Sequence, residues 1–136
     1  MKILIFGSEY FKLFSNVLNF DENQVLLFSK KNDQEVLNHS IASSNFQKET
    51  YFSKNMIDIN FSKFDEIDLF IVASSDDNLN ALFIHRLDQE YPDQEKILFI
   101  KDSHFAELQR DFGFNVFSIT ELLRGKLVDL FGGSID

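Results

Sequence analysis

The sequence predicts one α/β domain over residues 1–136, with a doubly wound parallel sheet of about six strands and helices on both faces. Short, wholly apolar runs, which are typical of strands buried on both faces, alternate with segments whose apolar residues recur at helical spacing. Strands joined by helices connect through right-handed crossovers and therefore lie parallel. The length suits one domain, and no linker, repeat or low-complexity segment divides it. The predicted fold is thus a single Rossmann-like domain.

The first half of the chain begins with the apolar run at 2–6, which predicts the first strand. Phe11, Phe14 and Leu18 recur at helical spacing after it. Strands are predicted at 2–6, 24–28 and near 50–52; helices are predicted at 9–19 and 32–39, and a short helix or turn near 55–63.

The second half carries a stronger pattern. The predicted strands are 68–73, 96–101 and 115–118; the predicted helices are 77–90, 103–112 and 120–131. In the first of these helices, Leu79, Leu82, Phe83 and Leu87 define the expected buried face. For the next helix, we expect Ser103 as the cap and Gly113 as the stop. Gly132-Gly133 is expected to end the last helix.

Composition excludes several classes of function. The chain has no cysteine, which rules out disulfides, thiolate catalysis and zinc–thiolate sites. A formal net charge of -9 argues against binding to nucleic acid. No apolar run reaches the ~20 residues that span a bilayer, and no signal-peptide pattern opens the chain. We therefore expect a cytoplasmic protein with no direct insertion into a membrane.

Ligands of doubly wound sheets bind at the carboxyl ends of the strands, near the point where the strand order reverses. The segments expected there are 7–11, 29–31, 73–77 and 101–103. The candidate ligand-contacting residues are Gly7, Ser8, Glu9, Tyr10, Ser29, Lys30, Ser74, Ser75, Asp77 and Asn80. No residue pattern predicts a catalytic group or a metal site.

Each candidate also has a purely structural interpretation. Gly7 suits either a phosphate loop or a tight strand-to-helix turn, and the tight turn is the favoured interpretation. Lys30 and Lys31 suit a solvated turn as well as a ligand phosphate. The polar turn 74–77 suits the capping of the following helix as well as contact with a ligand or a divalent cation. The histidines lack the spacing of metal ligands, so helix packing or surface exposure is expected for them.

Two stretches resemble a known family. In "DLFIVASSDDNLNALFIHRL" a strand ends at a small residue and a D-x-x-N element, here 77–80, opens an apolar helix. "ILFIKDSHFAELQRDFGFNVFSITELL" supplies the next strand, a helix that ends at Gly113, and a short last strand. Asp102, Ala106, Glu107 and Leu108 also fit the pattern. Together with the opening strand, these stretches resemble the RCK domain, also called the TrkA-N or potassium-transport nucleotide-binding domain.

The resemblance implies a cytoplasmic, non-catalytic regulatory lobe that acts with a membrane potassium channel or transporter. Such lobes bind NAD(H) or adenine nucleotides and respond by a change of conformation. They usually form dimers that assemble into rings. The corresponding helix of the family helps to join subunits, and here helix 120–131 is apolar on more than one side. A homodimer or higher oligomer through that helix is therefore expected, with association to a membrane only through a partner.

Four departures from the family pattern bear on the ligand. Glu9 and Lys12 stand where the second and third glycines of a phosphate loop are expected. Ser29 stands where an acid usually contacts the ribose. Ser53-Lys54 replaces a Gly-Asp pair, and Phe99 replaces an arginine. A carboxylate beside a phosphate costs about 1–4 kcal/mol at partly screened separations. These changes predict weakened or altered nucleotide binding.

Three hypotheses follow. The first is a regulatory module whose ligand is NAD(H), an adenine nucleotide or none. The alternative is a structural or interaction module that keeps the fold without a ligand. The third is a small NAD(P)-dependent oxidoreductase fragment, which would need an intact phosphate loop and a substrate domain that the sequence does not provide.

Overall fold

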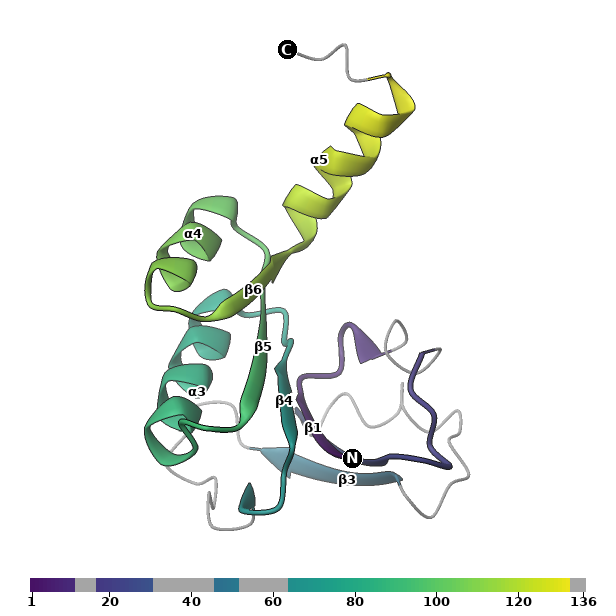
Figure 1. The fold of residues 1–136 in the computed structure, drawn as a ribbon, viewed down its shortest axis with the longest axis vertical. Helices are drawn as coiled ribbons and strands as arrows, with labels where there is room; N and C mark the ends of the chain where they lie inside the picture. Colours follow the sequence, from purple (N-terminus) through teal and green to yellow (C-terminus); the bar gives the residue numbers. More distant parts are fainter. Residues whose placement is uncertain (12–16, 31–45, 52–63, 133–136) are drawn as a thin grey trace.

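The computed structural model describes residues 1–11, 17–30, 46–51 and 64–132 (Figure 1). Its centre is a six-stranded, all-parallel sheet in the order β3-β2-β1-β4-β5-β6. The strands are β1 (Lys2–Phe6), β2 (Gln24–Lys30), β3 (Phe46–Tyr51), β4 (Leu69–Val72), β5 (Glu95–Ile100) and β6 (Asn115–Ser118). This order, with its reversal between β1 and β4, confirms the predicted doubly wound, Rossmann-like fold.

The central strand β1 is buried on both faces from Ile3 to Phe6, as that apolar run predicts. Leu4 and Phe6 of β1 belong to the core on one side of the sheet, where the ring of Phe6 stacks on that of Phe83 at 4.0 Å. Ile3 and Ile5 point to the other side and pack in the core that contains Phe11. Alternation of side chains along a strand therefore divides the core into two layers.

Helix α3 (Asp77–Glu90) has the predicted bounds, but its buried face differs from the prediction. Leu82 is 52% exposed, whereas Asn80 is fully buried. The buried positions Asn80, Phe83, Ile84 and Leu87 follow the i, i+3, i+4, i+7 stripe. A polar residue occupies the stripe because its hydrogen bonds are made inside the protein.

Two helix starts also differ from the prediction. Helix α4 (Ser103–Asp111) is capped by Asp102, whose carboxylate accepts a hydrogen bond from the Phe105 amide at 2.8 Å. Ser103 is therefore the first helical residue, and the prediction that it is the cap was wrong. Helix α5 (Ile119–Leu130) begins directly after β6 and is capped by Ser118. Gly113 follows α4 with a φ of 96°, as expected for a helix stop.

The first half of the chain is described in part. β3 begins four residues before the predicted strand, at Phe46. It pairs with β2 alone, and an edge strand needs no continuous apolar run. Residues 12–16, the middle of the predicted helix 9–19, lie outside the described residues. The predicted segments 32–39 and 55–63 also lie outside them.

Helix α5 departs from the layered arrangement. It leaves the end of β6 and extends away from the sheet and from α3 and α4 (Figure 1). None of its residues is buried. Across residues 1–11, 17–30, 46–51 and 64–132, no helix is both long and apolar enough to cross a membrane.

Candidate functional site

The turn after β1 lies in direct contact with the turn after β4. The Gly7 amide donates to the carbonyl of Phe28 at 2.8 Å, and the Ala73 amide donates to the carbonyl of Phe6 at 2.7 Å. A Cβ on Gly7 would lie 2.5 Å from both the nitrogen and the Cα of Ser74, and Gly7 has a φ of 102°. Glycine is therefore required here by packing and by backbone conformation, which supports the structural interpretation of Gly7.

A hydrogen bond joins the same two turns at their outer edge. The Ser75 hydroxyl donates to the Glu9 carboxylate at 2.8 Å. Glu9 is exposed and Ser75 is half-buried. Because β1 and β4 flank the reversal of strand order, this bond spans the place where a doubly wound fold binds its ligand.

Beneath this bond, Asn80 fixes the turn after β4. Its side-chain oxygen accepts from the backbone amide of Ser74 at 3.0 Å and also from the Ser74 hydroxyl. Its side-chain nitrogen donates to the carbonyls of Ser74 at 2.9 Å and Phe99 at 3.0 Å. Every polar atom of the Asn80 amide is thus engaged within the chain, which leaves it a positioning role.

The acidic side chains of the β4–α3 turn accept hydrogen bonds from backbone amides. Asp76 caps α3 by accepting from the Leu79 amide at 3.1 Å. Asp77 accepts from the amides of Lys101 at 2.8 Å and Asp102 at 3.0 Å, and so ties the start of α3 to the turn after β5. The predicted capping role is confirmed for Asp76, while Asp77 links two neighbouring turns.

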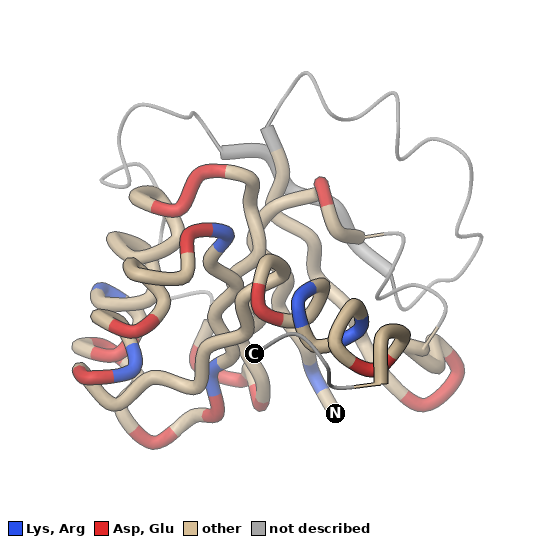
Figure 2. Tube along the Cα trace, turned by 90° about the horizontal axis from the view of Figure 1, so that it is seen from above, with Lys and Arg blue, Asp and Glu red and all other residues tan. Residues whose placement is uncertain are grey.

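Aromatic rings extend from the β1 turn across the sheet. The Tyr10 ring lies 6.1 Å from that of Phe99, and Phe99 stacks with Phe117 at 5.7 Å. Partial burial raises the pKa of the Tyr10 hydroxyl, and the negative charges of Asp77 and Glu9 raise it further. The carboxyl edge of the sheet is therefore acidic beside an aromatic surface, within a chain whose acidic residues outnumber its basic ones (Figure 2).

Three further predicted site residues have other surroundings. Ser29 lies at the end of β2, fully buried, and its hydroxyl has no hydrogen-bond partner among the described residues. Ser8 is half-buried, and its carbonyl accepts from the Phe11 amide at 3.1 Å. The backbone of Lys30 ends β2, but its side chain lies outside the described residues.

The structure brings most of the predicted residues to one edge, where they contact one another. Glu9, Ser75, Ser74, Asn80 and Asp77 connect the turns after β1, β4 and β5. Sequence reasoning missed that Phe99 and Phe117 form a joint surface beside them, since Phe99 stands out in the sequence only as a departure from the family pattern. Strand alternation, which puts Ile97 and Phe99 on one face, is the signal that could have found this surface.

The histidine and metal expectations concern other parts of the protein. His85 lies between the rings of Phe112 and Phe114, at 5.0 and 4.8 Å, and its Nε2 is 3.0 Å from the Gln109 side-chain oxygen. This placement agrees with the predicted role in helix packing. In the described part of the chain, no three His, Asp or Glu side chains gather as a metal site would require.

Comparison of the sequence with protein-family models and with curated proteins gives no match.

Proposed function

We propose that the chain is a non-catalytic regulatory module of the kind that RCK domains provide for potassium channels and transporters, with weakened or altered binding of NAD(H) or adenine nucleotides. The hydrogen bond between Glu9 and Ser75 is the observation that carries this proposal. It joins two turns at the place where the fold class binds ligands. A ligand that enters there has to separate them.

The same bond gives the module a means of response. Ser75 follows Ser74, which Asn80 holds, and Asn80 in turn holds the carbonyl of Phe99 in β5. Displacement of the β4 turn by a ligand is therefore transmitted to β5 and to the start of α3. A ligand changes the balance between two conformations only by its different affinity for each.

Glu9 determines which ligands the edge accepts. A carboxylate at this turn repels a phosphate by about 1–4 kcal/mol at partly screened separations, roughly a five- to thousandfold loss of affinity. The carboxylate is also an acceptor for hydroxyl and amino groups. Weak binding of phosphorylated nucleotides is thus expected in the natural chain.

The second part of the proposal concerns partners. The module forms a homodimer or higher oligomer through α5, whose exposed leucines have no cover within the described chain. Leu122, Leu123, Leu127 and Leu130 are each at least half exposed. Contiguous apolar surface of this kind marks sites of protein association. A transporter or channel subunit is the proposed further partner.

Thermal unfolding with NAD⁺, NADH, NADP⁺, ATP, ADP and AMP tests the ligand part. We expect small shifts of the Tm for the natural chain and larger ones for Glu9→Gly, which removes the charge and opens the turn. A ligand at about 100 times its Kd stabilises the fold by about 2.7 kcal/mol. NADH absorbance should stay constant throughout, since no hydride is transferred.

Glu22→Gly is the matched control, because it removes one exposed acid from a turn beside Lys2 and Gln24, at the opposite edge of the sheet. It should leave every shift unchanged. If neither the natural chain nor Glu9→Gly responds to any nucleotide, the ligand-binding proposal fails and the alternative, a ligand-free interaction module, takes its place.

A further inference from the structure

Several backbone amides at the carboxyl edge of the sheet donate within the chain. The amides of Gly7 and Ala73 donate to carbonyls of neighbouring strands, at 2.8 and 2.7 Å. The amide of Ser74 donates to the Asn80 side chain at 3.0 Å, and that of Asp76 donates to the Ser74 hydroxyl at 3.2 Å. A phosphate-binding turn holds its ligand by backbone amides that point at it. These four amides are already used, so they offer nothing to a phosphate.

Side chains at the same edge present oxygen acceptors. Glu9 is exposed, and one of its carboxylate oxygens accepts from Ser75 at 2.8 Å, which leaves the other for a ligand. Burial raises the pKa of the Tyr10 hydroxyl, and the charges of Asp77 and Glu9 raise it further, so this hydroxyl lies near both carboxylates. The turns after β1 and β4 contain no lysine, arginine or histidine. These turns therefore combine negative charge with hydrogen-bond acceptors.

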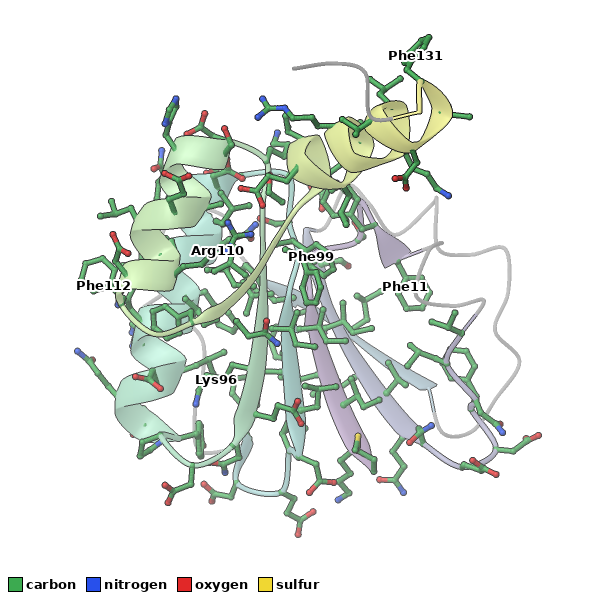
Figure 3. All side chains as sticks on the ribbon, turned by 45° about the horizontal axis from the view of Figure 1, so that its top comes forward. Phe11, Lys96, Phe99, Arg110, Phe112 and Phe131 are labelled. Atoms are coloured by element: carbon green, nitrogen blue, oxygen red, sulfur yellow. The ribbon has the colours of Figure 1, made fainter. Side chains whose placement is uncertain are left out.

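A buried hydroxyl without a partner lies beside this edge. Pairing of Phe6 with Phe28 places the next residues, Gly7 and Ser29, side by side. Strand alternation puts Ser29 on the face that packs against Phe11, which Figure 3 shows on the side of the sheet away from α3 and α4. The Ser29 side chain is fully buried, and its hydroxyl makes no hydrogen bond within the described part of the chain. A buried hydroxyl is destabilising until a partner reaches it.

Ser29 and the Glu9–Ser75 bond lie on either side of β1. Ser29 ends β2, and Ser75 follows β4, and these strands are the two neighbours of β1. Because adjacent strands are about 4.8 Å apart, the two acceptors are separated by about 10 Å across the sheet. Gly7 lies between them and has no side chain. A ligand that uses both acceptors therefore needs hydrogen-bond donors at two ends, and it has to move the β1 turn to reach the buried hydroxyl.

We propose that the carboxyl edge binds a small organic cation, an amine with N–H donors at both ends, one end at Glu9 and the other at Ser29. This inference rests on the proposed function, because it names the class of ligand for the same site. An ammonium group has donors and no acceptor, which suits a carboxylate and a hydroxyl oxygen. The ring of Tyr10 adds an aromatic face on which a cation is attracted. A phosphate carries acceptors and negative charge, so it has neither property.

Calorimetric titration with putrescine, a diamine, tests the proposal at physiological salt, where general attraction to an acidic surface is screened. Its permethylated analogue is the matched ligand, because it keeps both charges and has no N–H donor. We expect putrescine to bind about tenfold more tightly than the analogue. Glu9→Gln should weaken putrescine about tenfold. Glu22→Gln removes an equal charge from an exposed position at the opposite edge of the sheet and should leave the affinity unchanged.

Ser29→Ala separates ligand binding from a structural role. The free protein should keep its Tm or gain stability, because the substitution removes a buried hydroxyl that has no partner. The same variant should bind putrescine about fivefold more weakly. Ser118→Ala is the control, since Ser118 is also buried but its hydroxyl donates to the carbonyl of Lys101 and accepts from the Glu121 amide. It should lower the Tm and leave the affinity for putrescine unchanged.

Other outcomes overturn the proposal in distinguishable ways. Equal weakening by Glu9→Gln and Glu22→Gln would make putrescine a general counter-ion of an acidic chain. Equal affinity for putrescine and its analogue would remove the role of N–H donors. A Ser29→Ala variant that loses stability and keeps its affinity would give Ser29 a structural role only. If nucleotides bind and putrescine does not, this inference fails while the proposed function stands, and if neither binds, both fail.

Discussion

At the scale of single residues, the carboxyl edge uses its polar groups to hold its own turns. Asn80 and Ser74 are buried and bonded to each other, and Gly7 lies against Ser74 without room for a side chain. The sequence places all three at this edge correctly. Their bonding partners could not be predicted, because hydrogen bonds between turns depend on distances that only the assembled sheet defines.

Replacement of Asn80 by alanine should lower the free energy of unfolding by about 3 kcal/mol, because it leaves the buried polar groups of Ser74 and the carbonyl of Phe99 without the bonds that Asn80 makes. Chemical denaturation measures the change. Asn78→Ala, at an exposed position of the same helix, should stay within about 0.5 kcal/mol. Equal effects of the two substitutions would refute the positioning role of Asn80.

Gly7→Ala should destabilise the fold by about 3 kcal/mol, because the new methyl group meets backbone atoms of Ser74 and the residue has a positive φ. Gly113→Ala separates the two causes. Gly113 also has a positive φ, but a methyl group added to it would meet nothing within 4 Å, so a cost of about 1 kcal/mol is expected. If urea unfolding shows that Gly7→Ala and Gly113→Ala lower the free energy of unfolding equally, the contact with Ser74 contributes nothing to the effect at Gly7.

At the scale of elements, hydrophobic pattern predicts what is buried and misses what is anchored by polar contacts. The strands and α3 follow from apolar runs and helical spacing. Lys96 in β5 shows the limit, because its ammonium is buried and donates to the carbonyls of Tyr91 and Gln94 beside an ion pair with Asp88. The direction of α5 depends in the same way on Arg110, which lies 11 residues from its partner Glu121.

The ion pair at the base of α5 should make its anchoring sensitive to acid. Hydrogen bonds from Arg110 lower the pKa of Glu121 below its ordinary value of 4.5. The folded state then binds fewer protons than the unfolded state, so this contribution to stability is present above that ordinary value and is lost as the pH falls through the lowered pKa. Glu121→Gln should reduce the fall of the Tm between about pH 5 and pH 3.

Asp129→Asn is the control for this measurement, because it removes an exposed carboxylate from the far end of the same helix. Its Tm should follow the natural chain over the acid range. A Glu121→Gln variant that loses stability on acidification as steeply as the natural chain would show that Arg110 does not anchor α5 through this charge.

At the scale of the whole molecule, the sequence predicts a doubly wound sheet. The described residues show that sheet, followed by a helix none of whose residues is buried, and Phe117 of β6 is 39% exposed. Strand order follows from alternation and crossover rules that any such chain obeys. The exposure of Leu123 and Phe117 could not be predicted, because apolar residues at helix and strand spacing indicate burial without saying in which chain.

Sedimentation equilibrium is the most direct test of the central claim that the module functions as an assembly joined through α5. From about 1 to 100 μM, a range that suits interfaces of modest size, the natural chain should shift from the mass of one chain to that of two. Leu123→Ser combined with Leu127→Ser should keep the mass of one chain throughout, with the helical content of the fold retained. A natural chain that remains a monomer at the highest concentration would contradict the claim.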